Sequence, residues 1–204
     1  MTDLYLIRHG ETLFNQLGCF QGHSDSPLTE VGQQQALNLV NYFQTTPLQQ
    51  LYCSDLGRAI TSARPLAEAK NLSVQTCKQL REISYDYLDG QSKQQLTVHD
   101  KQKLQRLFSA KLDYRIGEGE TLKEVQLRLF NKINDIQMAH AGQSIAVMTH
   151  GLSIVMLIKK ILQIPVDAPR QFNIHNASVC HLSFKSGQWL LQSIERNDLN
   201  LHSS

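Results

Sequence analysis

Two histidines directly follow short apolar segments of the chain, and they are the first candidates for chemistry. His9 comes after residues 4–7 and Arg8, and His150 comes after the apolar run 144–149. Neutral imidazole has a free lone pair near pH 7, with a reference pKa of about 6.5, so it attacks an electrophile without a separate base. Arg8 offers a fork of donors that suits phosphoryl oxygens. Taken alone, each histidine is more often structural than functional, and the two together are a first indication of a functional site.

The hydrophobic pattern predicts alternating strands and helices that would position these histidines. Short apolar runs predict strands at residues 4–7, 51–54, 72–77 and 144–149. Apolar residues at helical spacing predict helices at about 29–43, 58–70, 121–136 and 153–162, with an N-cap at Thr29 and a capping box, Thr121-x-x-Glu124. Residues 178–184 and 189–194, on either side of Ser186-Gly187, predict a β-hairpin.

This alternation predicts an α/β fold. We expect a three-layer α/β/α sandwich with a mostly parallel central sheet and one antiparallel edge strand. Residues 1–204 are expected to form a single domain, with a small helical insertion at about 90–119, where the chain is polar and has no strong apolar stripe. Ligands of such sheets bind beyond the carboxyl ends of the strands, where both His9 and His150 are expected.

Composition limits the classes of protein that the chain can belong to. Hydrophobic residues make up 41% and charged residues 19%, which is typical of a soluble globular protein. The net charge of +2, without blocks of like charge, predicts neither nucleic-acid nor membrane binding. There is no signal-peptide pattern at the N-terminus, and the four cysteines are far apart, so we expect reduced thiols and a cytoplasmic location.

The sequence contains no motif typical of several other kinds of catalytic site. The eight histidines form no His-Glu-x-x-His motif, and the cysteines form no Cys-x-x-Cys pair, so we expect neither a metal nor another cofactor. Neither Gly-x-Ser-x-Gly nor a P-loop occurs, which argues against a serine hydrolase and a nucleoside triphosphatase.

Five short motifs lie in order along nearly the whole chain. They are Leu-Ile-Arg-His-Gly-Glu-Thr at 6–12 with Asn15 following, the segment 20–32 around Gln21-Gly22, the segment 53–63 around Arg58, Leu-Arg-Glu-Ile at 80–83, and Thr-His-Gly at 149–151. In this order they resemble the histidine phosphatase superfamily, in its phosphoglycerate mutase-like branch. Any single motif is weak evidence, and the resemblance rests on all five together.

The resemblance implies a role for each matching residue. His9 would be the nucleophile that forms a phosphohistidine, Arg8, Arg58 and His150 would surround the phosphoryl group, and Asn15 would add a hydrogen bond. Such a set suits phosphoryl transfer, because the charge of the transferred group spreads over its oxygens and is stabilised by fixed donors. The alternative for Arg58 is an exposed charge at a helix N-terminus, where it gains nothing from the helix dipole.

Further residues are implied around this centre. Glu82 would be the general acid that protonates the leaving alkoxide and later takes a proton from water, although by itself Arg81-Glu82 is an ordinary surface ion-pair candidate. Gln21 and Gly22 are expected at the mouth of the pocket. The triplet 176–178 either lies beside the site or forms the turn before the hairpin.

The predicted function is hydrolysis of a phosphomonoester, with a small phosphorylated metabolite as substrate. One alternative is a cofactor-dependent phosphoglycerate mutase, for which the insertion supplies only Lys101, Lys103 and Arg106 as extra cations. Another is a non-catalytic phosphate-binding regulatory protein, which the presence of all central residues disfavours. The sequence leaves the oligomeric state open.

Two regions depart from the family pattern. Many phosphatases of this group have glycine where Asp86 stands and a Trp-Glu pair where Leu88-Asp89 stands, and members often have arginine near Val155. A carboxylate of Asp86 that faced the pocket would repel strongly anionic substrates, whereas a solvated loop position is the simpler interpretation.

Overall fold

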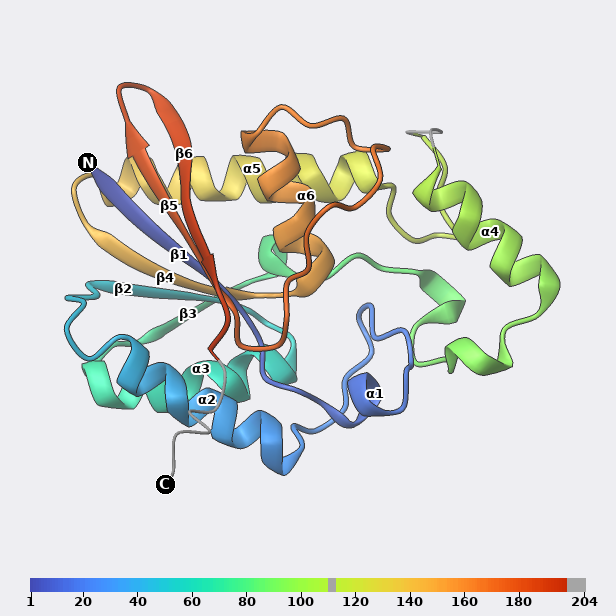
Figure 1. Cartoon of the computed structure of the whole chain (residues 1–204), viewed down its shortest axis with the longest axis horizontal. Helices are drawn as coiled ribbons and strands as arrows, with labels where there is room; N and C mark the ends of the chain where they lie inside the picture. Colours follow the sequence, from blue (N-terminus) through green and yellow to red (C-terminus); the bar gives the residue numbers. More distant parts are fainter. Residues whose placement is uncertain (110–112, 198–204) are drawn as a thin grey trace.

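The computed structural model describes residues 1–109 and 113–197 of the chain. Six strands in this part form one sheet in the order β3-β2-β4-β1-β5-β6 (Figure 1). Their bounds are Thr2–Arg8 (β1), Gln50–Ser54 (β2), Val74–Cys77 (β3), Ser144–Thr149 (β4), Val179–Lys185 (β5) and Gln188–Glu195 (β6). The predicted α/β fold is confirmed.

The antiparallel part of the sheet is a hairpin rather than a single edge strand. Strands β1 to β4 pair in parallel, β5 pairs antiparallel to β1, and the outer strand β6 pairs antiparallel to β5. The one reversed strand is therefore β5, second from the edge. Ser186 and Gly187 at the turn both have positive φ, 52° and 80°, as the tight turn of a two-residue hairpin requires.

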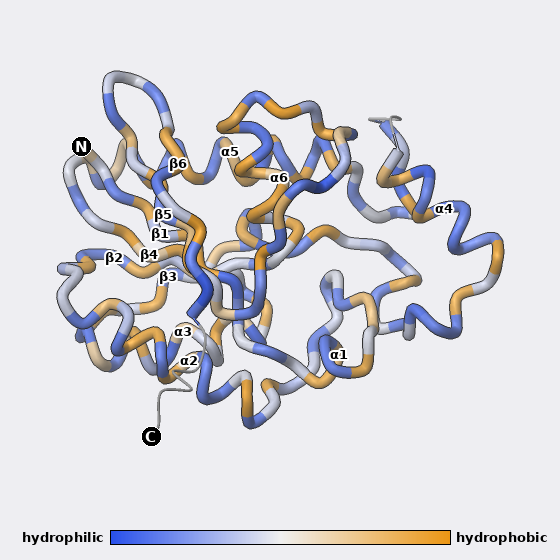
Figure 2. The backbone as a smooth tube through the Cα atoms, in the orientation of Figure 1, coloured by the Kyte–Doolittle hydropathy of each residue, from blue (hydrophilic) through white to orange (hydrophobic). Residues whose placement is uncertain are grey.

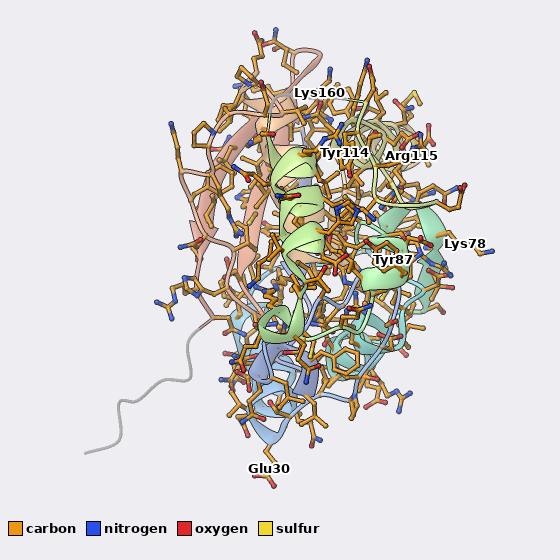
Figure 3. The ribbon with its side chains drawn as sticks, turned by 90° about the vertical axis from the view of Figure 1, so that its right-hand side faces the viewer. Glu30, Lys78, Tyr87, Tyr114, Arg115 and Lys160 are labelled. Carbon is orange, nitrogen blue, oxygen red and sulfur yellow. The ribbon has the colours of Figure 1, made fainter. Side chains whose placement is uncertain are left out.

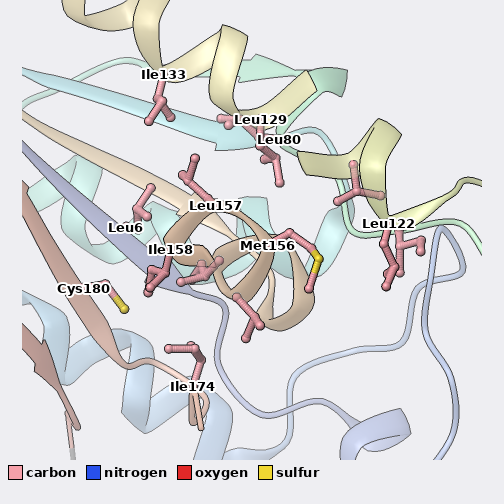
Figure 4. Packing of buried hydrophobic residues seen from close by; sticks show 14 of the residues in the cluster. Leu6, Leu80, Leu122, Leu129, Ile133, Met156, Leu157, Ile158, Ile174 and Cys180 are labelled. Atoms are coloured by element: carbon pink, nitrogen blue, oxygen red, sulfur yellow. The ribbon is translucent and has the colours of Figure 1, made fainter. Parts of the chain in front are cut away.

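Helices cover both faces of the sheet, as expected for three layers. Helices α2 (Glu30–Tyr42) and α3 (Gly57–Lys70) lie on one face, and α5 (Leu122–Ala139) and α6 (Gly151–Ile161) lie on the other (Figure 1). Because neighbouring strand residues point to opposite faces, Ile7 packs in the core beside α2 and α3, whereas Leu6 packs beside α5 and α6 (Figure 4). Both predicted N-caps form: the Thr29 side chain accepts from the backbone N–H of Gly32, and Thr121 and Glu124 form the capping box.

The segment expected as an insertion lies beyond the carboxyl ends of the strands. It contains a 3₁₀ turn, Lys93–Gln95, and helix α4 (Val98–Phe108), which Figure 3 shows facing the viewer. Helix α4 buries Leu104 and Leu107, and the colouring of Figure 2 alternates along it as in an amphipathic helix. That residues 1–204 form one domain with an insertion stays a prediction. None of the described helices has the length and apolar character needed to cross a bilayer.

Candidate active site

The carboxyl end of β1 opens into a pocket of about 520 Å³. Seven of the eight residues predicted for the site line this pocket: Arg8, His9, Asn15, Gln21, Gly22, Arg58 and Glu82. The eighth, His150, is fully buried directly behind His9, and the centroids of the two rings are 5.2 Å apart. The structure therefore brings together residues from five separate motifs.

His9 is held as a neutral ring with a defined tautomer. Its Nδ1 lies 2.7 Å from the carbonyl oxygen of Gly10, and because that oxygen can only accept, Nδ1 carries the proton. The lone pair is then on Nε2. Burial, followed by the charges of Arg58 and Arg8, holds the pKa of His9 well below its ordinary value, so the lone pair stays available at neutral pH.

His150 follows β4 as His9 follows β1, and its Nε2 lies 2.8 Å from the Ser54 hydroxyl at the end of β2. Its Nδ1 is buried and has no hydrogen-bond partner among the described residues. If Ser54 donates its proton to Nε2, then Nδ1 carries the ring proton and is a free donor. Burial is the main cause that lowers the pKa of His150, so this ring is neutral too.

Arg58 is buried, not exposed, although it belongs to the first turn of α3. Its Nη1 donates to Asp25 at 2.7 Å and to the Ser24 carbonyl at 2.8 Å, and its Nη2 donates to the Gly22 carbonyl at 2.8 Å. Asp25 also accepts from the backbone N–H of Gly57, so one carboxylate both caps α3 and pairs with the guanidinium. This contact offsets the unfavourable placement of a cation at a helix N-terminus.

The two arginines share an unusual feature. The Nε atoms of Arg8 and Arg58 are buried without an acceptor in the part of the chain that the structure describes. Burial, together with the charges of Arg170 and Arg58, lowers the pKa of Arg8 to about 10, while Glu82 opposes this shift. Buried donors without an acceptor are costly, so this end of the pocket is suited to an anion.

Glu82 lies where α6 begins. One carboxylate oxygen accepts from the backbone N–H of Leu152 at 3.0 Å, and the other accepts from the N–H of Ser153 and its hydroxyl, both at 3.1 Å. The N-cap of α6, His150, makes no side-chain cap of its own, so Glu82 satisfies the free N–H groups of the first turn. The predicted acid thereby lies at the start of the helix that follows His150, in the same pocket lining as His9.

The triplet 176–178 lies beside the site and also forms the turn before β5, so both of its interpretations are confirmed. Asn176 donates to the His9 carbonyl and to Asn15 Oδ1, each at 3.1 Å. Since Asn15 Oδ1 also accepts from the backbone N–H of Thr12, the amide nitrogen of Asn15 is the group left for a ligand.

Comparison with known proteins agrees with this geometry. The family model of the histidine phosphatase superfamily (branch 1) matches residues 4–197. The chain belongs to this superfamily.

Relatives and solved structures extend the comparison. The probable phosphoglycerate mutase GpmB of Yersinia pestis (strain Pestoides F) is 31% identical over 190 residues, covering 93% of this chain and 88% of the relative. YhfR of Bacillus stearothermophilus is 28% identical, with 98% of each chain covered and a TM-score of 0.88. A phosphoserine phosphatase mutant from Entamoeba histolytica in complex with phosphoserine is 25% identical, covering 97% of this chain and 98% of that chain, with a TM-score of 0.86.

The two departures from the superfamily pattern have different outcomes. Asp86 is absent from the pocket lining, and its φ of 55° explains why glycine suits this position. Val155 does line the pocket and leaves that part of its wall apolar. Of the insertion cations, Lys103 donates to the Tyr87 hydroxyl and Arg106 lies over the Tyr114 ring, and neither lines the pocket.

Sequence reasoning missed several pocket residues outside the motifs. Arg170 and Lys159 line the pocket, and the insertion contributes Lys93 and Phe108 to the same lining. Segment 163–175 has no regular secondary structure, and its sequence carries no apolar period that predicts its path. Among the described residues, no group of three or more His, Cys, Asp or Glu side chains is arranged to hold a metal.

The two buried neutral histidines predict a pH-dependent stability. Their folded pKa values lie below the unfolded value of about 6.5, so at lower pH the unfolded chain binds more protons than the folded chain. The free energy of unfolding is therefore expected to fall as the pH drops below about 6.5, by up to about 1.4 kcal/mol per pH unit for each histidine.

Urea unfolding measured at a series of pH values checks this expectation. His150→Gln should remove about half of the pH dependence of the free energy of unfolding that the two buried histidines cause, because glutamine does not titrate. The same change at exposed His99 should leave this pH dependence as in wild type. An unchanged slope in His150→Gln would contradict a buried neutral ring.

Proposed function

We propose that this protein is a phosphohydrolase that removes the phosphoryl group of a small phosphorylated metabolite through a phosphohistidine at His9. One observation carries the proposal: among the described residues, the buried donors Arg8 Nε and Arg58 Nε lack acceptors, and His150 Nδ1 beside them has no hydrogen-bond partner. Oxygens of a phosphoryl group would accept from both arginines, and from His150 in the tautomer that carries its proton on Nδ1, while the Nε2 lone pair of His9 would face the phosphorus.

The proposed reaction has two steps. His9 Nε2 attacks the phosphorus while the bond to the leaving oxygen breaks, and protonated Glu82 gives its proton to that oxygen. Glu82, now ionised, takes a proton from a water molecule, whose oxygen attacks the phosphohistidine. Inorganic phosphate leaves, and both His9 and Glu82 return to their first states. Arg8 and Arg58 stabilise the charge of the transferred group in both steps.

Hydrolysis is preferred over the mutase alternative because of the pocket lining. A mutase must bind a second phosphate and exclude water, yet Lys101, Lys103 and Arg106 of the insertion do not line the pocket. The further cations that do line it are Lys93, Arg170 and Lys159, and the Lys159 ammonium already donates to two carbonyls. The similarity to a probable phosphoglycerate mutase keeps this activity as the second candidate. We further propose that the reaction needs no metal and that the protein acts in the cytoplasm without binding nucleic acid or membrane, which rests on the sequence pattern.

A substrate panel in the presence of EDTA tests the proposal. Release of inorganic phosphate from p-nitrophenyl phosphate and from small phosphomonoesters supports hydrolysis. Formation of 2-phosphoglycerate from 3-phosphoglycerate and 2,3-bisphosphoglycerate without phosphate release supports a mutase. Phosphate binding without any turnover supports a regulatory protein, and activity that EDTA abolishes contradicts the metal-free mechanism.

Replacement of Glu82 by glutamine tests its role as the acid. Turnover of an alkyl phosphate is expected to fall by about 10²- to 10⁴-fold, because the alkoxide no longer receives a proton. Release of p-nitrophenol in the first turnover should slow much less, since this leaving group departs as a stable anion. The second half-reaction, in which Glu82 acts as the base, is common to both substrates, so the measurement is the pre-steady-state rate of leaving-group release. Equal losses of this rate for both substrates would contradict general-acid catalysis by Glu82 and indicate a structural effect on α6.

A further inference from the structure

One cation of the pocket wall has no function in the proposed phosphoryl transfer. Arg170 lies in the segment between α6 and β5, which comes from a different part of the chain than Arg8 and Arg58. Its Nε donates to the carbonyl of Phe172 at 2.8 Å. Within residues 1–109 and 113–197, neither Nη1 nor Nη2 has a hydrogen-bond acceptor, and no carboxylate forms an ion pair with this guanidinium.

Arg170 lines the same pocket as Arg8, His9 and Glu82. In agreement with this placement, its charge contributes to lowering the pKa of Arg8. Burial lowers the pKa of Arg170 itself, while Glu82 and Tyr85 oppose that shift. Arg170 remains accessible at the rim, where a ligand can reach it.

The backbone around Arg170 is fixed in place from α6. Lys159 is a buried lysine, 3% exposed, and its ammonium donates to the carbonyls of Val166 and Ala168, four and two residues before Arg170. On the other side, Arg8 Nη1 donates to the Ile174 carbonyl at 2.7 Å. The backbone of the segment is thus held on both sides of Arg170 by cationic side chains, and the Arg170 side chain is held by its own bond to the Phe172 carbonyl, which is the arrangement expected of a built binding wall.

We propose that Arg170 is a specificity-determining residue, which binds a carboxylate of the substrate, so that the preferred substrates are small phosphomonoesters that also carry a carboxylate group. The inference rests on the proposed function. The free Nη1–Nη2 edge matches the two oxygens of a carboxylate. The other lysines of the lining have contacts of their own: the Lys159 ammonium is bound to two carbonyls, and that of Lys93 lies over the Phe20 ring. Val155, Met156 and Pro169 in the same lining are apolar, so one free guanidinium suits a carboxylate better than a second phosphate.

Matched substrates isolate the carboxylate. O-Phosphoserine and O-phosphoethanolamine differ only in this group, and 3-phosphoglycerate and glycerol 3-phosphate differ in a carboxylate against a hydroxymethyl group. Wild-type protein is expected to have the higher kcat/KM for the carboxylate member of each pair. Arg170→Gln should reduce this preference by about 10- to 100-fold, mainly through KM, because a charge-assisted contact present in both ground and transition states is lost.

Arg64→Gln is the matched control, because Arg64 is an exposed arginine of α3 that does not line the pocket. It should keep the wild-type preference, and Arg170→Lys should keep part of it. Equal losses in Arg170→Gln for both members of a pair, or a wild type without preference, would overturn the inference.

Binding measurements separate this inference from the proposed function. If wild-type protein releases phosphate from no substrate, hydrolysis is refuted, while calorimetric titration with O-phosphoserine and O-phosphoethanolamine still tests recognition. Tighter binding of O-phosphoserine that Arg170→Gln removes supports the carboxylate site, and equal affinities for the two compounds refute it.

Discussion

Replacing His9 by alanine is expected to lower kcat by at least about 10⁴-fold, because no other side chain replaces a covalent nucleophile. The protein should still bind phosphate, since the Nε atoms of Arg8 and Arg58 stay in place. Phosphate release measures the loss of turnover, and calorimetric titration with inorganic phosphate measures binding. Intact-mass analysis of wild-type protein, quenched at neutral pH during turnover, should show one added phosphoryl group that His9→Ala lacks.

A control keeps this result specific. His99→Ala changes an exposed histidine of α4 and should leave both kcat and the added mass as in wild type. Normal turnover in His9→Ala would refute the mechanism, and an added phosphoryl group in that variant would place the nucleophile elsewhere.

Replacing Arg58 by alanine is expected to lower kcat/KM by about 10²- to 10³-fold, because a fixed positive donor to the transferred group disappears. The same change should reduce the free energy of unfolding by about 3 kcal/mol, since it leaves Asp25 and the carbonyls of Gly22 and Ser24 without their donor. Steady-state kinetics and urea unfolding measure the two effects separately.

Asp25→Asn separates catalysis from stability. It removes the partner charge but keeps Arg58 and an oxygen that accepts from the Gly57 N–H. This variant is expected to lose stability while kcat/KM stays within about tenfold of wild type. Comparable losses of activity in both variants would mean that Arg58 acts only by holding the 22–25 loop in place.

Local patterns predicted the parts of the fold that depend on local contacts. The N-cap at Thr29 and the capping box at Thr121 formed as expected, because each depends on hydrogen bonds over three residues. The strand expected at 72–77 begins only at Val74. Leu72 instead donates its N–H to the Ala67 carbonyl and belongs to the C-terminal cap of α3. Asn71, with a φ of 52°, ends that helix. The apolar character of Leu72 in the sequence does not distinguish such a cap from the start of a strand.

The candidate site was predictable where it belongs to motifs and not elsewhere. His9, Glu82 and Arg58 each stand in a short recognisable pattern. The position of Arg170 depends instead on Lys159 reaching carbonyls of a segment without regular structure, so only the folded chain reveals it. The capping of α6 by Glu82 was equally hidden, because residues 82 and 152 are 70 positions apart.

The hydrogen bond from Arg8 to the Ile174 carbonyl limits how this fold can acquire a preference for new substrates. A residue of the reaction centre holds the last part of the segment that forms the pocket wall. Insertions or deletions close to residue 174 would pull on Arg8 and impair chemistry for every substrate. Lys159 holds the earlier part of the same segment through the carbonyls of Val166 and Ala168, so the segment is anchored at both ends. Laboratory selection for altered substrates is therefore expected to change side chains of the segment, such as that of Arg170, rather than its length.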